Sequence, residues 1–261
     1  MTTIINDVLY DEKKQLATDI YLPEKTNAET KILLFWHGGG WFRGDKSNLK
    51  DYCTQITEQN FIVFAPNYSL APKHIFPAAH NDSVTFVNWL LNSSYGQNRT
   101  NAITQLGASS GGVIALFLAG KYGFPTVTWS APVSFSSWMK NHQDVRPSQQ
   151  ANFEFGITDL KQINDAFYKY FTLTYTGTDK QETLKKLDAQ SYDYDNLGRL
   201  LMLNSTNELS PTDYLLDFIS QLAKADHSID LKLIAGKRHA MSYANDYLVE
   251  SISYLAKKTV K

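Results

Sequence analysis

Short apolar runs, of the kind that form buried strands, alternate along this chain with longer amphipathic stretches that are typical of helices. The pattern predicts strands at 31–36, 61–66, 102–107, 126–132, 199–204 and 229–236. It predicts helices at 47–59, with Ser47 as the N-cap, and at 78–92, 111–123, 211–225 and 241–257. Two runs of alternating polarity, 4–10 and 15–22, indicate an opening hairpin. Strands and helices in alternation favour a parallel sheet covered by helices, so the expected fold class is α/β.

The regular alternation lapses over about residues 134–198, where Ser, Gln, Asn, Asp and Tyr are frequent. Only two helical patches, 158–171 and 179–188, are predicted there. We therefore expect a single domain, 1–261, with an insertion that acts as a lid or binding loop. The aromatic residues of the insertion are expected either to line a pocket or to pack onto the body. They are Phe135, Trp138, Phe153, Phe155, Phe167, Tyr168 and Tyr170.

The composition excludes several classes of protein. With 25 basic and 26 acidic residues the formal charge is −1, so nucleic acid is not an expected partner. The only cysteine, Cys53, excludes a disulfide framework and a cysteine-based zinc site, and is expected in the core. The N-terminus does not resemble a signal peptide, and no apolar run approaches the roughly 18 residues of a membrane span. We expect a cytoplasmic protein with no membrane partner; the sequence does not predict an oligomeric state.

The strongest local motif is Gly107-Ala108-Ser109-Ser110-Gly111, a G-x-S-x-G pentapeptide between a predicted strand and a predicted helix. A serine hydroxyl is a weak nucleophile, so it needs a tight turn that presents it to a base. The flanking glycines allow the strand and the helix to approach closely. The motif in this context predicts that Ser109 is a catalytic nucleophile.

A second motif, His37-Gly38-Gly39-Gly40-Trp41, directly follows the predicted strand 31–36. Consecutive glycines let backbone N–H groups converge on one point without interference from side chains, as an oxyanion hole requires. A glycine-rich loop can also bind phosphate, but neither G-x-x-x-x-G-K-[ST] nor G-x-G-x-x-G is present, so no nucleotide or other cofactor is expected. No metal is expected either.

A catalytic base is expected after the last strand, because strand-turn-helix serine hydrolases order their triad as Ser, acid, His. Beyond the insertion the chain has two histidines, His227 and His239. His227 falls at the end of a predicted helix, on the wrong side of the sheet. His239 follows the predicted strand 229–236 at the carboxyl edge, where such sites form, and is the expected base.

A longer segment supports a family resemblance. The stretch NYSLAPKHIFPAAHNDSVTFVNWL (67–90), with HGGGW before it and GASSGG after it, resembles the hormone-sensitive-lipase-like carboxylesterases, a branch of the α/β-hydrolases. The similarity in order and spacing covers about residues 31–123. It implies an α/β-hydrolase fold with a mostly parallel eight-stranded sheet, helices on both faces and a lid insertion.

The resemblance also implies roles for individual residues. The N–H groups of Gly39, Gly40 and Ser110 would form the oxyanion hole, and His37 would have a structural role. Tyr68, Pro72 and Pro77 would support the wall of the active site. Asp82 would start the following helix; it precedes Ser109, so the chain order excludes it as the catalytic acid.

The family's acid is expected in the loop after strand 199–204, which reads Ser205-Thr206-Asn207-Glu208-Leu209-Ser210-Pro211. A comparison without gaps to the form S-x-D-E-x-x-P places Asn207 at the acid position, and a shift of one residue places Glu208 there. A glutamate can orient the imidazole and stabilise the imidazolium, whereas an asparagine supplies no charge. Asp213 is a third candidate. We expect Glu208, with Asn207 and Asp213 as alternatives.

These residues predict a serine hydrolase that cleaves small, short-chain carboxylic esters through an acyl-enzyme. Ser109, His239 and Glu208 would form its triad. The alternatives are an amidase, aryl-formamidase or peptidase on the same scaffold, and a ligand-binding α/β-hydrolase that has lost catalysis. The expected partner is a small ester substrate.

Overall fold

The computed structural model describes every residue except 28, 98, 100–101 and 258–261. Its centre is an eight-stranded sheet in the order β1-β2-β4-β3-β5-β6-β7-β8. The strands are β1 (Thr3–Asp11), β2 (Leu16–Leu22), β3 (Lys31–Trp36), β4 (Phe61–Pro66), β5 (Ile103–Ala108), β6 (Thr126–Trp129), β7 (Leu200–Ser205) and β8 (Ile229–Ile234). β2 pairs antiparallel with β1 and β4, and all other pairs are parallel. The expected opening hairpin and mostly parallel sheet are confirmed.

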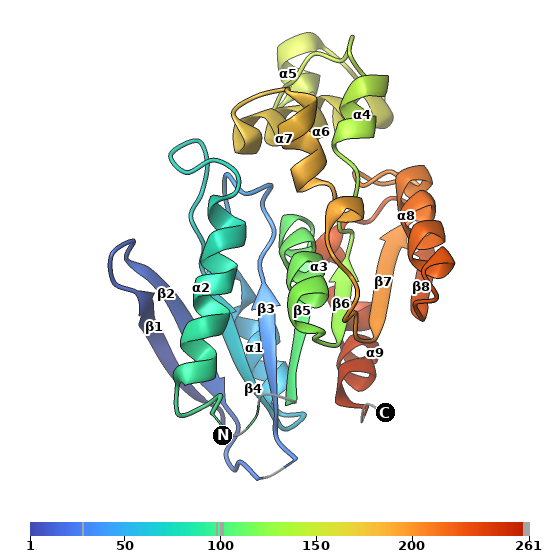
Figure 1. Cartoon of the computed structure of the whole chain (residues 1–261). Helices are drawn as coiled ribbons and strands as arrows, with labels where there is room; N and C mark the ends of the chain where they lie inside the picture. Colours follow the sequence, from blue (N-terminus) through green and yellow to red (C-terminus); the bar gives the residue numbers. More distant parts are fainter. Residues whose placement is uncertain (28, 98, 100–101, 258–261) are drawn as a thin grey trace.

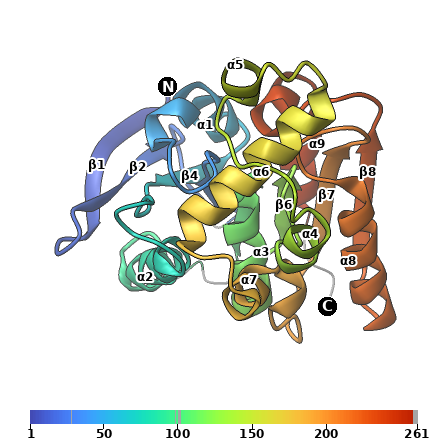
Figure 2. The same cartoon turned by 90° about the horizontal axis from the view of Figure 1, so that it is seen from above.

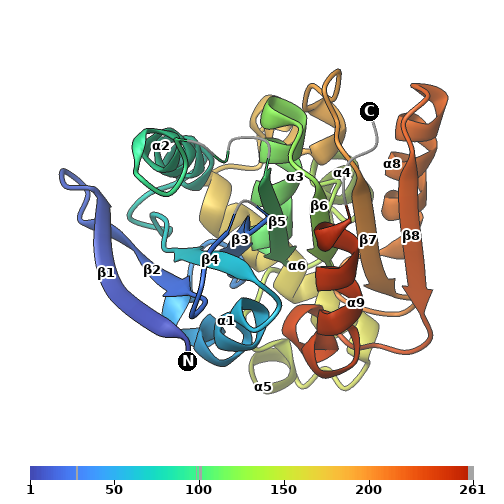
Figure 3. The ribbon, with the colours of Figure 1, turned by 90° about the horizontal axis from the view of Figure 1, so that it is seen from below.

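Helices cover both faces of the sheet (Figure 3). They are α1 (Lys50–Thr57), α2 (Ala78–Asn92), α3 (Ser110–Tyr122), α4 (Ser136–Asn141), α5 (Ala151–Phe155), α6 (Leu160–Thr176), α7 (Gln181–Leu187), α8 (Thr212–Lys224) and α9 (Ala244–Ala256), with short 3₁₀ turns at Lys46–Leu49, Ala189–Ser191 and Ala240–Tyr243. α2, α3 and α8 pack on one face, and α1 and α9 pack on the other.

The side chains of β3 show how one apolar run serves both faces. Ile32 and Leu34 join the core beneath α2 and α3, whereas Leu33 and Phe35 join the core beneath α1 and α9. Successive side chains of a strand point to opposite faces, so a central strand with helices on both sides must be apolar throughout. Cys53 is a free, buried thiol on the α1 face, as expected.

One local expectation was wrong, and one local feature was not predicted. Ser47 does not cap the helix of residues 47–59. This stretch is a 3₁₀ turn followed by α1, and the Asp45 carboxylate caps the turn by accepting a bond from the Ser47 N–H at 2.8 Å. The insertion also contains two short helices, α4 and α5, that the sequence did not predict. Helices of five or six residues carry too little periodicity to be recognised.

The insertion between β6 and β7 places α4–α7 over the carboxyl ends of the parallel strands (Figures 1 and 2). Asp188, near the end of the insertion, is hydrogen-bonded to two residues at its start. The Asp188 carboxylate accepts bonds from the Phe135 N–H at 2.5 Å and the Ser136 N–H at 3.0 Å, and also from the Ser136 hydroxyl.

In the described part of the chain, no helix has the length and apolar character needed to cross a membrane.

Candidate active site

Ser109 lies on a strained turn between β5 and α3. Its backbone has φ 53° and ψ −122°, a conformation that side-chain-bearing residues seldom adopt. The neighbouring glycines make this turn possible. A Cβ atom on Gly107 would lie 2.3 Å from the Gly111 oxygen, and one on Gly111 would lie 2.2 Å from the Trp36 oxygen. A larger residue at either position would force neighbouring backbone segments apart. Close packing therefore requires both glycines of the pentapeptide.

His239 lies after β8 and faces the serine. Its Nε2 atom is 3.0 Å from Ser109 Oγ, and its Nδ1 atom is 2.5 Å from Glu208 Oε2. A carboxylate only accepts hydrogen bonds, so this arrangement requires the proton on Nδ1 and leaves Nε2 free to accept the serine proton. Ser242 fixes the backbone of the histidine, because its hydroxyl accepts a bond from the His239 N–H at 2.8 Å.

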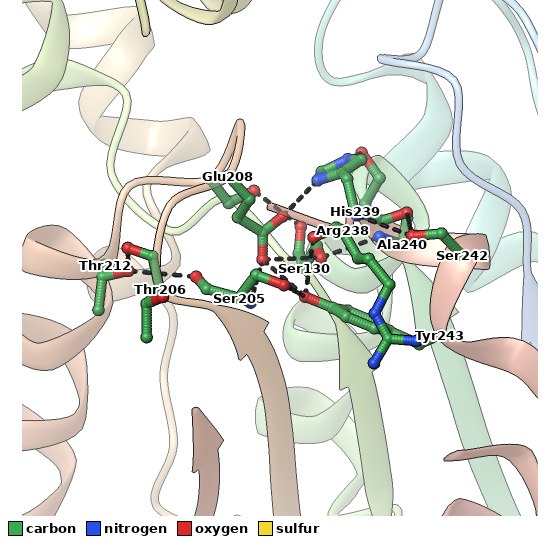
Figure 4. A network of polar contacts seen from close by, with 12 residues as sticks. Ser130, Ser205, Thr206, Glu208, Thr212, Arg238, His239, Ala240, Ser242 and Tyr243 are labelled. Carbon is green, nitrogen blue, oxygen red and sulfur yellow. Dashed lines mark hydrogen bonds and ion pairs between the residues drawn. The ribbon is translucent and has the colours of Figure 1, made fainter. Parts of the chain in front are cut away.

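Glu208 has a fully buried side chain (0% exposed), and polar contacts surround it (Figure 4). Its second oxygen, Oε1, accepts hydrogen bonds from the Ser130 hydroxyl at 3.0 Å, the Ser205 N–H at 2.7 Å and the Tyr243 hydroxyl at 3.0 Å. Burying a carboxylate is costly unless its oxygens are satisfied. The three donors and His239 meet that requirement, so the carboxylate is held in one orientation.

The other two candidates for the acid do not reach the histidine. Within the described residues, neither Asn207 nor Asp213 forms a hydrogen bond with His239. The Asn207 N–H donates to the Gly236 oxygen at 2.9 Å, and Asp213 lies in the first turn of α8. The structure therefore brings together Ser109, His239 and Glu208.

Sequence reasoning missed two residues of this network, Ser130 and Tyr243. The Ser130 hydroxyl donates to Glu208 and accepts a bond from the Ala240 N–H at 2.9 Å, so it links the acid to the loop that carries the histidine. Burial and the charge of Glu208 raise the pKa of Tyr243 to about 12. The position of Ser130, directly after β6 at the carboxyl edge of the sheet, could have marked it as a residue of the site.

The glycine loop after β3 lies beside the serine. Gly39 and Gly40 have φ values of 122° and 61°, which favour glycine. Their N–H groups make no hydrogen bond within the described part of the chain. Ser110 is the first residue of α3, and the first N–H groups of a helix have no partner inside it. Gly39 and Gly40 line the same cavity as Ser109, and Ser110 directly follows Ser109 in the chain.

Neighbouring aromatic residues hold this loop. The rings of His37 and Tyr68 stack with centroids 4.2 Å apart, and the Tyr68 hydroxyl donates to the His37 oxygen at 2.8 Å. Burial lowers the pKa of His37. The buried Trp41 ring stacks on Tyr175 of α6 at 4.4 Å. Trp41 therefore joins the glycine loop to the insertion.

The expectation that Asp82 starts a helix was wrong. Asp82 is the fifth residue of α2, and Pro77 holds the N-cap position without a side-chain cap bond. The Asp82 carboxylate accepts bonds from the Ser69 N–H at 2.8 Å and from Lys14 Nζ at 2.5 Å. It therefore fastens the loop before α2 to the opening hairpin.

A cavity of about 380 Å³ opens onto Ser109. The insertion contributes Phe167 and Phe171 of α6 to its wall. The remaining lining residues are His37, Gly38, Gly39, Gly40, Arg43, Gly44, Asn48, Leu49, Ala108, Leu209, His239, Ala240 and Met241. Among the insertion aromatics considered above, Phe167 lines this cavity. Phe135, Trp138 and Tyr168 are core residues, and Phe153 is exposed.

The described residues contain no cluster of three or more His, Cys, Asp or Glu side chains that could hold a metal ion.

Comparisons with known proteins place this geometry in context. The model of the family described as BD-FAE matches residues 18–192. Esterase LipI of Mycobacterium tuberculosis is 33% identical over 165 residues, which cover 60% of this chain and 50% of that protein. Carboxylesterase 20 of Arabidopsis thaliana is 26% identical over 153 residues, or 53% of this chain and 46% of that protein. The chain thus spans half or less of the length of these two relatives.

Solved structures share the fold at low sequence identity. EstE1, a thermostable carboxylesterase cloned from a metagenomic library, aligns with a TM-score of 0.78 at 16% identity, covering 98% of this chain and 88% of that chain. The Francisella virulence factor BioJ aligns with a TM-score of 0.76 at 18% identity, covering 98% and 85%. The fold is that of the α/β-hydrolases.

Proposed function

Because the chain belongs to the BD-FAE family, we propose that it is a carboxylesterase-type serine hydrolase that cleaves small esters through an acyl-enzyme. The observation that carries the proposal is the continuous line of contacts from Glu208 through His239 to Ser109. The similarity to an esterase and a carboxylesterase supports the same chemistry.

In the proposed reaction, Ser109 Oγ attacks the ester carbonyl while His239 Nε2 accepts its proton. Glu208 keeps the proton of the imidazole on Nδ1 and stabilises the imidazolium that forms. His239 then protonates the leaving alcohol. Water, activated by the same imidazole, releases the acid from Ser109.

The negative charge that develops on the carbonyl oxygen requires donors that are already in position. We assign this role to the N–H groups of Gly39, Gly40 and Ser110, which point to no acceptor in the described part of the chain. Removing one donor of this kind commonly lowers turnover by about 10²–10³.

The insertion of residues 134–198 serves as the lid in this proposal. Phe167 and Phe171 give the cavity an apolar wall, and a volume of about 380 Å³ suits a small substrate. Short acyl chains should therefore be preferred.

The test is the hydrolysis of 4-nitrophenyl esters of increasing acyl length by the wild type and by Ser109→Ala. We expect turnover that falls with acyl length, and a loss of more than about 10⁴ in the variant. A phosphonate probe should label Ser109, as peptide mass spectrometry would show. Matching 4-nitroanilides test the amidase alternative. Equal turnover by the wild type and Ser109→Ala would refute the proposal.

A further inference from the structure

Arg43 lies in the turn that follows the glycines and lines the cavity at Ser109. Its N–H donates to the Gly39 oxygen at 3.2 Å. The two backbones are in direct contact, since a Cβ atom on Gly39 would lie 2.0 Å from the Arg43 oxygen. The backbone of Arg43 is therefore held next to Gly39, a residue of the proposed oxyanion hole.

The guanidinium group of Arg43 lies against two aromatic rings. Its central carbon is 5.2 Å from the centroid of Phe42 and 5.3 Å from that of Phe167 on α6. An arginine is always charged and carries five N–H donors in a planar fork. Arg43 is exposed, and among the described residues its side chain forms no ion pair and donates no hydrogen bond. Its N–H donors are therefore open to solvent or to a ligand.

Two other cations of this region are neutralised. Lys46, three residues further along the chain, pairs with Asp19 at 2.6 Å and with Asp7 at 2.8 Å. Arg238, next to the proposed base, pairs with Asp246. Among the described residues that line the cavity, Arg43 is the one arginine or lysine.

None of the lining residues that the structure describes is acidic, and the remaining surface of the wall is largely apolar. Leu49, Phe171, Leu209 and Met241 provide that apolar surface. Such a site matches a ligand with an apolar portion next to the serine and a negative charge at one end.

We propose that Arg43 is a specificity-determining residue that binds a carboxylate carried by the ester substrate. The inference rests on the proposed function and names its substrate class: esters with a free carboxylate on either the acyl or the alcohol side. The fork of an arginine fits a carboxylate with two parallel hydrogen bonds.

The test compares two pairs of esters, and in each pair one ester carries a carboxylate that the other lacks. On the acyl side, the mono-4-nitrophenyl ester of glutaric acid is compared with 4-nitrophenyl pentanoate. On the alcohol side, 4-acetoxybenzoate is compared with its methyl ester. The measured quantity is the ratio of kcat/KM for the charged ester to that for the neutral one. The proteins are the wild type, Arg43→Gln, Arg43→Lys and Lys237→Gln, a control that removes an exposed charge in the loop before His239.

We expect Arg43→Gln to lower this ratio about five- to tenfold for one of the two pairs, which also identifies the side that carries the carboxylate. Arg43→Lys should give an intermediate ratio, because it keeps the charge and loses the fork. Lys237→Gln should leave the ratio within twofold. Because an exposed contact is screened, the wild-type preference should shrink when the ionic strength rises from about 0.02 M to about 0.5 M.

A purely structural role, such as holding α6 through Phe167, would change both esters of a pair equally. A ratio that Arg43→Gln leaves unmoved for both pairs, or that Lys237→Gln lowers as strongly, would overturn the inference. In either case hydrolysis of the neutral esters would leave the proposed function standing. A wild type that hydrolyses none of the four esters would overturn both.

Discussion

Replacing Glu208 by glutamine tests the proposed triad at its acid. Glutamine has nearly the same shape, but one of its two terminal groups is an NH₂ that only donates. The structure determines which group faces the histidine. Oε1 accepts three hydrogen bonds, from Ser130, Ser205 and Tyr243, and only an oxygen can take that place. The amide nitrogen must therefore occupy the Oε2 position, 2.5 Å from His239 Nδ1 in the wild type.

An NH₂ at that position forces Nδ1 to accept, which moves the imidazole proton to Nε2. Nε2 then cannot accept the proton of Ser109. A wrong tautomer with intact geometry lowers kcat by about 10⁴ in serine proteases, and we expect a loss of about 10³–10⁴ for Glu208→Gln. KM should change little, because the cavity wall is unaltered. The three retained bonds at the amide oxygen should limit the loss of stability to about 1–2 kcal/mol.

The assay measures kcat and KM on 4-nitrophenyl acetate, together with the melting temperature. Asn207→Ala and Asp213→Asn are matched controls from the same region, and both should keep kcat within about threefold. The reasoning would be refuted if Glu208→Gln kept more than a tenth of the wild-type kcat, or if either control lost as much as Glu208→Gln.

Ser130→Ala removes a hydrogen-bond donor to Glu208 and the acceptor of the Ala240 N–H. We therefore expect kcat to fall about tenfold, with a smaller change in KM. An unchanged kcat would contradict a positioning role for Ser130. Burial lowers the pKa of His80 to about 3 from the ordinary value of 6.5, so unfolding takes up a proton between these values. The free energy of unfolding should fall with decreasing pH below 6.5, by up to about 1.4 kcal/mol per pH unit, and urea titrations should show a shallower fall for His80→Gln. An equal dependence of the free energy of unfolding on pH in the wild type and in His80→Gln would refute the assignment of this effect to His80.

The sequence predicted the sheet well, because long apolar runs reflect burial on both faces. The run 31–36 matches β3 residue for residue, and the amphipathic stretch 78–92 matches α2. The insertion was predicted less well. Its short helices depend on contacts distant in sequence, such as the Asp188 carboxylate at the Phe135 and Ser136 N–H groups, rather than on their own periodicity.

The serine and the histidine could be located from the sequence because each position is tied to a strand end. The proposed acid, Glu208, was harder to locate, because it lies in the loop after β7 and its position depends on contacts with residues distant in sequence. Asn207 and Glu208 are adjacent, so a shift of one residue in the sequence comparison decides which of them is predicted to face His239. Contacts from Ser130 after β6 and Tyr243 before α9 settle the geometry, and neither contact is visible as a motif.

The same network supports the proposal that a glutamate takes the place of the shorter aspartate as the triad acid. A glutamate has one more rotatable bond, so fixing it costs more side-chain entropy. Here three donors hold Oε1, which leaves Oε2 facing His239 Nδ1 with little remaining freedom. The imidazole of His239 needs a carboxylate oxygen within hydrogen-bond distance of Nδ1. An aspartate or a glutamate of the loop can supply this oxygen, provided that neighbouring donors hold its carboxylate in place. In this chain the residues that hold the acid are therefore as decisive for the proposed chemistry as the acid itself.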